Sequence, residues 1–436
     1  MLHLPFVAWL GLLAVSSSLR AGDGAAYPTA PSRKGLQVQM VDDALELGVA
    51  HAALNVNFAQ LHTRATDASS LEFEHAGRTW RFDRAYLQSL DRDIRPLSEK
   101  GVLVSLILLS LASGDADKDS FLLDVRRDAK APNGICAPNL ATPESRAWHA
   151  AALACMARRW SGTSQHGSVW GWIVGNEVNS HHWWFHMGPA TLEQVARAYE
   201  DFVRLVHDCA TAERTHARVY VSLEHHWSIR YPAASESQGF PGRDFLARFA
   251  AIARERGDFA WHVAYHPYPE DLFDCAFWDD ASAPDEDDAA RITFRNLPVL
   301  ARFLRRDELL FAGASRRVIL SEQGFHRADG DAGETLQAVA YAAAWHAVEL
   351  EPSIDAFLLS RHVDHAHEGG LRFGLWTRKA DSICTPERRT ALYGVFRDTA
   401  TPREAAAHAM ALKTLGIEDW KELPGRLGHR AARETR

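Results

Sequence analysis

Two glutamates of the chain follow short apolar segments, at the points where buried strands are expected to end. Glu177 closes the sequence WIVGNE at 172–177, and Glu322 follows ILS in the sequence ILSEQG at 319–324. Cleavage of a glycosidic bond needs two carboxyl groups across one cleft: one protonated to release the leaving oxygen, one ionised to attack or stabilise the anomeric carbon. Burial and mutual repulsion can hold their two pKa values apart. The pair therefore predicts acid–base and nucleophilic chemistry, provided that the fold brings both side chains to one pocket.

Polar and aromatic residues follow the other apolar segments, where they would surround a substrate. Each polar residue taken alone is more often a helix cap or a loop residue, but the whole set favours a binding site. Tryptophans in the same loops favour a carbohydrate, because sugar C–H faces pack on aromatic planes; packing of the loops onto the fold is the alternative. The expected substrate-binding residues are Asn55, Asn57, Asn176, Trp183, Trp184, His225, His226, His266, Tyr268, Arg361 and Trp376, and Trp227 lies in a similar loop.

The elements that would position these residues are apolar segments that alternate with amphipathic, helix-like stretches. Strands are expected at 36–40, 49–58, 102–109, 169–174, 218–223, 261–265, 317–320 and 354–359. This alternation predicts an α/β fold with a parallel sheet, and eight units fit a (β/α)8 TIM barrel with loop insertions, including a β-hairpin near 71–82. An open, doubly wound sheet is the alternative, but no Gly-x-Gly-x-x-Gly follows the first strands. In such a barrel the functional groups gather at the carboxyl ends of the strands.

The segment WIVGNE resembles the fourth strand of retaining glycoside hydrolases of clan A, such as those of families 5 and 39, and ILSEQG resembles the seventh strand. His266-Pro267-Tyr268 is similar to the sixth-strand His and Tyr beside the clan's nucleophile. The resemblance covers about residues 36–400. It implies that Glu177 is the acid/base, that Glu322 is the nucleophile with a hydrogen bond from Tyr268, and that Asn176 donates to the sugar 2-hydroxyl.

The sequence GNEVNSHHWWFHMG at 175–188 also resembles a bacterial family of uncharacterised, secreted, glycosidase-like proteins. Two positions depart from the clan pattern. The second strand offers Asn55 and Asn57 where the clan often has an Arg, and Arg361 and His362 follow the eighth strand where many members carry a Trp. These departures leave the sugar-binding subsite open.

Charge and the ends of the chain bear on partners and location. The 436 residues include 48 Lys and Arg against 56 Asp and Glu, a net charge of −8, which lacks the basic footprint of a nucleic-acid binder. The expected partner is a carbohydrate.

The apolar start predicts a signal peptide at 1–26 and a secreted or periplasmic protein, with one catalytic domain at 27–415 and a charged tail at 416–436. No segment of the mature chain is expected to span a membrane.

Two alternatives remain to glycoside hydrolysis. A metal-dependent barrel hydrolase would use some of the 22 histidines, which include adjacent pairs at 181–182 and 225–226 and a run at 362–367. Against it, Asn55 and Asn57 stand where amidohydrolase-type enzymes have His-x-His, and no His-Glu-x-x-His occurs. We therefore expect neither a metal nor another cofactor. A non-catalytic carbohydrate-binding barrel is the second alternative, although two buried carboxylates would cost it desolvation energy.

The chain has five cysteines, an odd number, and no two of them form a Cys-x-x-Cys motif. One disulfide, with Cys136 and Cys155 as the nearest pair, and buried free thiols are both compatible with this pattern.

Overall fold

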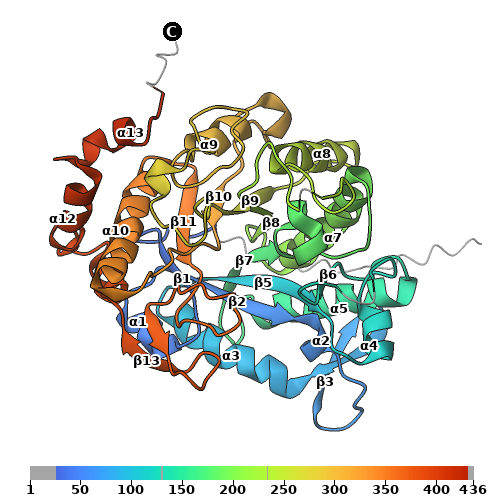
Figure 1. The fold of residues 1–436 in the computed structure, drawn as a ribbon. Helices are drawn as coiled ribbons and strands as arrows, with labels where there is room; N and C mark the ends of the chain where they lie inside the picture. Colours follow the sequence, from blue (N-terminus) through green and yellow to red (C-terminus); the bar gives the residue numbers. More distant parts are fainter. Residues whose placement is uncertain (1–25, 129–130, 233, 431–436) are drawn as a thin grey trace, which may run out of the picture.

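The computed structural model describes residues 26–128, 131–232 and 234–430. Its centre is a closed barrel of eight parallel strands, in which each strand pairs with its neighbour along the barrel and the ring closes through β1–β11 and β2–β5 (Figure 1). The predicted TIM barrel is confirmed. The barrel strands are β1 (Lys34–Gln37), β2 (His51–Asn57), β5 (Leu103–Leu111), β7 (Val169–Val174), β8 (Arg218–Glu224), β9 (Trp261–His266), β10 (Val318–Leu320) and β11 (Ile354–Leu359).

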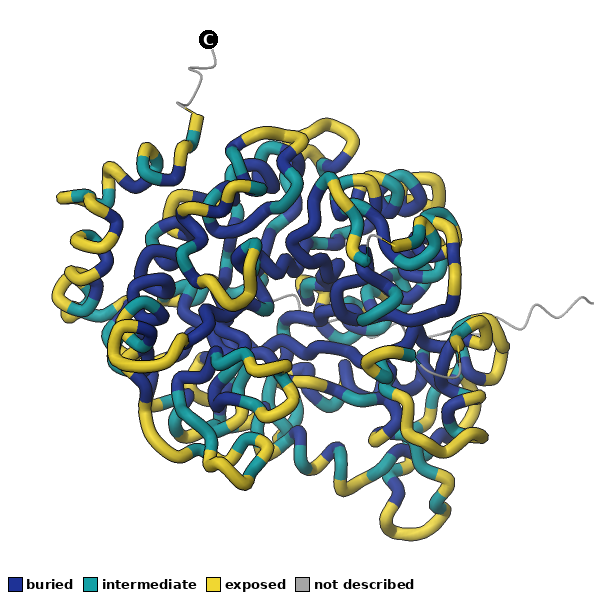
Figure 2. The backbone as a smooth tube through the Cα atoms, in the orientation of Figure 1, coloured by how far each residue is buried: buried dark blue, intermediate teal, exposed yellow. Residues whose placement is uncertain are grey.

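Helices surround the strands and turn their polar faces outward, so that exposed backbone lies at the periphery and buried backbone in the barrel (Figure 2). A capping box begins α7 (Leu192–Glu213): the Thr191 and Gln194 side chains each accept a hydrogen bond from the other's backbone N–H. The longer helices are α3 (Arg84–Glu99), α5 (Pro143–Arg159), α7 (Leu192–Glu213), α8 (Gly242–Glu255), α10 (Gly330–Glu349), α11 (Ala391–Asp398) and α12 (Glu404–Leu415). The shorter helices are α1 (Val41–Glu46), α2 (Phe58–Leu61), α4 (Ala116–Leu122), α6 (His181–Trp184), α9 (Pro298–Leu304) and α13 (Leu423–Arg426).

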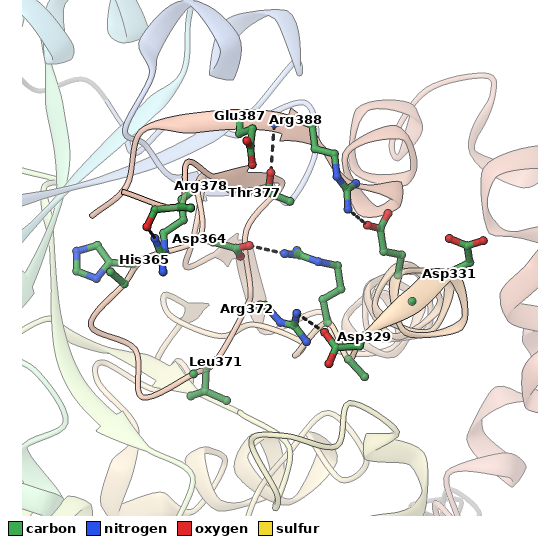
Figure 3. A pocket seen from close by; sticks show the side chains of 17 residues that line it. Asp329, Asp331, Asp364, His365, Leu371, Arg372, Thr377, Arg378, Glu387 and Arg388 are labelled. Carbon is green, nitrogen blue, oxygen red and sulfur yellow. Dashed lines mark hydrogen bonds and ion pairs between the residues drawn. The ribbon is translucent and has the colours of Figure 1, made fainter. Parts of the chain in front are cut away.

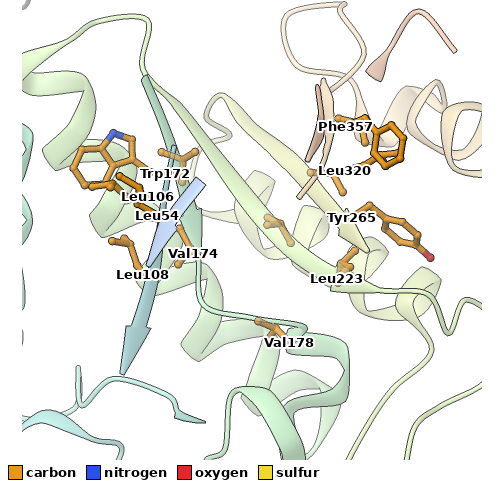
Figure 4. Packing of buried hydrophobic residues seen from close by; sticks show 14 of the residues in the cluster. Leu54, Leu106, Leu108, Trp172, Val174, Val178, Leu223, Tyr265, Leu320 and Phe357 are labelled. Carbon is orange, nitrogen blue, oxygen red and sulfur yellow. The ribbon is translucent and has the colours of Figure 1, made fainter. Parts of the chain in front are cut away.

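Side chains alternate between two hydrophobic layers along each barrel strand, as the two-residue repeat of a strand requires. On β7, Ile173 belongs to the small cluster inside the barrel, together with Tyr220 of β8. Its neighbours Trp172 and Val174 pack outward against the helices, in the layer that Figure 4 shows around Leu106. Because both faces of β5 are buried, this strand reads as a nearly continuous apolar run in the sequence.

Three short additions decorate the barrel. The predicted hairpin is formed by β3 (Ser70–His75) and β4 (Arg78–Asp83). A two-residue strand, β6 (Ile135–Cys136), pairs antiparallel with the end of β5. A second antiparallel pair, β12 (Trp376–Arg378) and β13 (Pro386–Arg389), follows β11.

The terminal segments and the cysteines complete the description. The expected signal peptide at 1–26 lies, apart from Ala26, outside the described residues. Within the expected tail, Leu423 and Leu427 are buried and α13 contacts α10, so the tail packs on the barrel as far as it is described. All five cysteines are free thiols. Among the described helices, none combines the length and the apolar character needed to cross a bilayer.

Candidate active site

The carboxyl ends of the barrel strands surround a cavity of about 690 Å³. Both glutamates that the sequence singles out line it, although they are 145 positions apart in the chain (322 − 177). Most of the expected substrate-binding residues line it as well: Asn55, Asn176, Trp184, His225, His226, Tyr268 and Arg361.

Glu177 is held in an unusual backbone conformation at the end of β7. Its φ of 41° and ψ of 52° lie in the left-handed region, which non-glycine residues rarely adopt. The Ser222 hydroxyl accepts a hydrogen bond from the Glu177 N–H at 3.0 Å, and Glu177 Oε1 lies 2.9 Å from Nδ1 of His266. His266 is fully buried, and its Nε2 lies 3.0 Å from the Ser321 hydroxyl. Strained backbone that the surroundings hold in place is typical of functional sites.

Burial favours the protonated form of the Glu177 side chain, which a general acid requires. Removal from water raises its pKa to about 7, in spite of the His266 hydrogen bond and charge, which act to lower it; the charges of Glu322 and Glu224 add to the rise. For His266, burial acts to lower the pKa, but the hydrogen bond to Glu177 and the surrounding carboxylates raise it above the usual value. Glu177 and His266 therefore form a buried pair that holds a proton near neutral pH.

Glu322 lies beside Glu177 and receives hydrogen bonds from the last residue of β1 and from the segment that follows β9. The Tyr268 hydroxyl donates to Oε1 at 3.2 Å, and the Gln37 amide donates to Oε2 at 3.4 Å. One carboxylate oxygen each of Glu177 and Glu322 and one ring nitrogen of His266 lie within 4.8 Å of one another. The two carboxyl groups thus face the same cavity with different partners, His266 for Glu177 and Tyr268 with Gln37 for Glu322.

A third carboxylate, Glu224, lies in the same cavity and is absent from the set predicted from sequence. Burial acts to raise its pKa, but the charge and hydrogen bonds of His226 and the charge of His225 lower it to about 2. Asn179 and Ser180 donate to Oε1 at 2.5 and 2.8 Å, and the His226 N–H and Nδ1 lie 2.8 and 2.6 Å from Oε2. Glu224 is therefore ionised and serves to orient His226.

Aromatic and apolar side chains form one wall of the cavity. The Tyr231 ring is 45% exposed and stacks on His226, with ring centroids 5.0 Å apart and planes 6° apart. Trp183 stacks on Tyr231 at 6.3 Å and supports it without lining the cavity. Phe373 packs against Tyr268. The remaining lining residues that the sequence analysis missed include Gln37, Asn133, Glu270, Leu272, Arg291 and Leu371.

Three further sequence expectations differ from the structure. The Asn57 side chain accepts from Ala59 N–H at 2.9 Å and caps α2 instead of lining the cavity. Trp376 donates from Nε1 to Asp43 at 2.9 Å, away from the cavity. Trp227 is fully buried and packs edge-on against Phe303. All three side chains therefore have structural roles: Asn57 caps a helix, Trp376 bonds the partly buried Asp43, and Trp227 packs in the core.

Two groups of potential metal ligands lie in the cavity: Glu224 with His225 and His226, and Glu177 with His266 and Glu322. The hydrogen bonds given above already engage both oxygens of Glu224 and both ring nitrogens of His266. These donor sets fit a hydrogen-bonded network better than a resident metal ion.

A second cavity, also of about 690 Å³, shares Leu371 with the first and lies between the loop after β11 and the start of α10. Figure 3 shows ion pairs between several of its charged side chains. Arg372 bonds Asp329 at 2.7 Å, and Arg327 and Arg388 pair with Asp364 and Glu334. The loop with the run of histidines thus forms the wall between two cavities.

The barrel resembles solved glycoside hydrolases. It is similar to a family 39 glycoside hydrolase from the gut symbiont Bacteroides cellulosilyticus, with a TM-score of 0.52, 14% identity, and coverage of 87% of this chain and 66% of that chain. A glucosidase from Croceicoccus marinus gives a TM-score of 0.51, 12% identity, and coverage of 87% and 69%. The chain therefore spans about two thirds of each solved chain's length. The expected likeness to clan A is confirmed at the level of the fold.

A comparison with curated protein sequences gives no match. The model of the Family of unknown function (DUF5722) matches residues 26–423, and the chain therefore belongs to this family.

Proposed function

We propose that the protein is a glycoside hydrolase that cleaves O-glycosidic bonds of an oligo- or polysaccharide with retention of the anomeric configuration. The observation that carries the proposal is the pair formed by Glu177 and Glu322: one carboxylate oxygen of each lies within 4.8 Å of the other, over one cavity. Retaining enzymes hold their two carboxyl groups about 5–5.5 Å apart, whereas inverting enzymes leave about 6.5–9.5 Å for a water molecule. The short separation supports retention.

The chemistry follows from the environments of the two glutamates. Glu322 attacks the anomeric carbon while Glu177 gives its proton to the departing oxygen, so that the glycosidic bond breaks and an ester to Glu322 forms. Glu177, now ionised, takes a proton from a water molecule, which attacks the same carbon and releases Glu322. The pKa of about 7 supports Glu177 in both roles.

The cavity wall supports a carbohydrate as the substrate. Tyr231 and Trp184 offer aromatic surface, while Asn55, Asn176 and His226 offer polar groups for sugar hydroxyls. This combination of flat apolar surface and a few placed polar groups suits a sugar ring, which is apolar on its faces and polar at its edge.

The test is a screen of the purified protein against plant, algal and bacterial polysaccharides, with release of reducing sugar as the readout. Glu322→Gln should lower the rate at least about a thousandfold, the order expected when a covalent nucleophile is lost. Glu72→Gln is the matched control, because this glutamate is 60% exposed on the hairpin, and should keep the wild-type rate.

Other outcomes of the screen favour the alternatives. Equal sugar release by wild type and Glu322→Gln would remove the proposed mechanism. Polysaccharide binding without release would point to a binding barrel. Sugar release that persists in Glu322→Gln, and that a chelator abolishes and zinc restores, would point to metal-dependent hydrolysis.

A further inference from the structure

A cluster of potential metal ligands lies outside the cavity, between α10 and α12, which pack side by side (Figure 1). His346 is on α10, and Glu404 and His408 are one turn apart on α12. One donor atom of each lies within 4.8 Å of the other two, and His346 Nε2 is 3.0 Å from His408 Nδ1. Residues four apart on a helix share a face, which is why one helix supplies two of the three side chains.

The ring nitrogens that point away from the contact between the two histidines are His346 Nδ1 and His408 Nε2. Each forms a hydrogen bond with an oxygen. His346 Nδ1 lies 2.7 Å from Glu349 Oε2, and an ionised carboxylate only accepts, so this nitrogen carries a hydrogen. His408 Nε2 lies 2.9 Å from the Thr399 hydroxyl, which donates to the Val395 carbonyl at 2.8 Å. With the hydroxyl hydrogen directed at that carbonyl, His408 Nε2 is the donor to Thr399.

This hydrogen assignment leaves two lone pairs facing each other. A neutral imidazole carries one hydrogen, so His346 Nε2 and His408 Nδ1 are both bare at a separation of 3.0 Å. Two lone pairs at that distance repel unless a cation lies between them. The Glu404 carboxylate, which accepts from Ala400 N–H at 2.7 Å, adds a negative charge beside them.

We propose that His346, Glu404 and His408 form a zinc site that joins α12 to α10, with a water molecule as the fourth ligand. Imidazole and carboxylate donors suit zinc, which holds them at about 2.0–2.2 Å and hence about 3.4 Å apart in a tetrahedron, so small side-chain movements complete the site. Glu349 accepts from the far nitrogen of His346 as an outer carboxylate does in zinc proteins. The proposal does not depend on the glycosidase function.

The surroundings of the cluster suit a structural ion. Trp420 stacks on the His346 ring, with centroids 3.8 Å apart and planes 23° apart, and His408 is fully buried. The ion would hold α10, α12 and the segment with Trp420 together, and thereby fasten the C-terminal helices to the barrel.

The test titrates the full-length protein, stripped with a chelator, with ZnCl2 in a calorimeter. We expect one tight equivalent for the wild type. The affinity should fall at least about 100-fold in His408→Gln, since loss of an outer partner alone costs 10–100-fold. Glu349→Gln should lose about tenfold. His216→Gln, at an exposed histidine, is the matched control and should bind as the wild type does.

Melting temperatures and a variant of the catalytic cavity test the location of the zinc ion independently. Excess zinc should raise the melting temperature of the wild type and leave that of Glu404→Gln unchanged, and far-UV circular dichroism checks that each variant folds. Glu322→Gln should retain the tight equivalent; its loss there would move the ion to the catalytic cavity and overturn the proposal. Wild-type zinc affinity in both His408→Gln and Glu404→Gln, or no tight zinc binding by the wild type, would overturn the proposal. The two histidines would then share only a hydrogen bond.

Discussion

Two buried carboxyl groups of the cavity, Glu177 and Glu224, differ because their partners differ. Glu224 accepts from four donors and has its pKa lowered to about 2. Glu177 has one partner, His266, and burial raises its pKa to about 7. The charge and the hydrogen bonds of the partners around each side chain therefore decide which group carries a proton at neutral pH.

The raised pKa of Glu177 predicts the alkaline limb of the pH profile. The proposed first step needs the protonated form, so kcat/KM should fall as the pH rises through about 7. Glu177→Gln should lose this limb and lower the rate about 10²- to 10⁴-fold on natural substrates, as expected for loss of a general acid. The measurement is kcat/KM against pH for both proteins.

A substrate with a good leaving group provides the control. An activated aryl glycoside needs little proton donation, so formation of the glycosyl-enzyme in Glu177→Gln should be slowed much less than with a natural sugar. An unchanged alkaline limb in Glu177→Gln would show that another group carries the proton.

At the scale of the elements, β7 and the turn that follows it direct the Glu177 side chain into the cavity. Ile173 faces the barrel interior, and the chain then leaves the strand through two left-handed residues, Gly175 at φ 66° and Glu177 at φ 41°. A side chain at position 175 would meet Phe185 at 3.0 Å, so glycine there permits both the turn and the close packing.

The interior of the barrel leaves no room at Gly171 of β7. A Cβ there would lie 2.9 Å from Ser105 Cβ and 3.3 Å from the Tyr220 ring. Gly171→Ala should therefore lower the free energy of unfolding by about 1–3 kcal/mol, as overpacking does. Gly394→Ala is the matched control: this glycine lies within α11 with open space around it, and the change should raise stability by about 0.5–1 kcal/mol. Urea unfolding measures both, and equal effects would contradict the interior assignment.

At the scale of the whole molecule, a buried lysine links the first strand to the C-terminal helices. Lys34 of β1 is 2% exposed, and its Nζ donates to the carbonyls of Phe396, Arg397 and Thr399 at 3.4, 3.3 and 2.8 Å. These carbonyls lie at the end of α11, where a cation also suits the helix dipole. The last carbonyls of a helix have no N–H partner within that helix. Lys34 supplies a donor to them although it is 362 to 365 positions away in the chain.

Replacement of Lys34 by methionine should destabilise the molecule. The change leaves buried carbonyls without a donor, and we expect a loss of about 2–3 kcal/mol in the free energy of unfolding. Lys413→Met, at an exposed position of α12, should change stability by less than about 0.5 kcal/mol. Urea denaturation followed by circular dichroism compares the two. A Lys34→Met protein as stable as Lys413→Met would contradict a stabilising role for the Lys34 hydrogen bonds to α11.

The sequence alone determined the barrel and the two glutamates at its centre. Strands buried on both faces appear as uninterrupted apolar runs, and the residues that follow them must meet at one end of a parallel barrel. That rule suffices to bring Glu177 and Glu322 to one cavity, because it depends on strand direction alone. Local sequence also predicted the hairpin of β3 and β4.

Only the tertiary structure decided which polar and aromatic neighbours line the cavity. Asn57 and Asn55 are two positions apart on β2, yet one caps α2 and the other lines the cavity. Trp376 meets Asp43, and Glu224 meets Asn179, through contacts between distant segments. A side chain's role depends on the partner it finds across the fold, and the sequence around it carries no record of that partner.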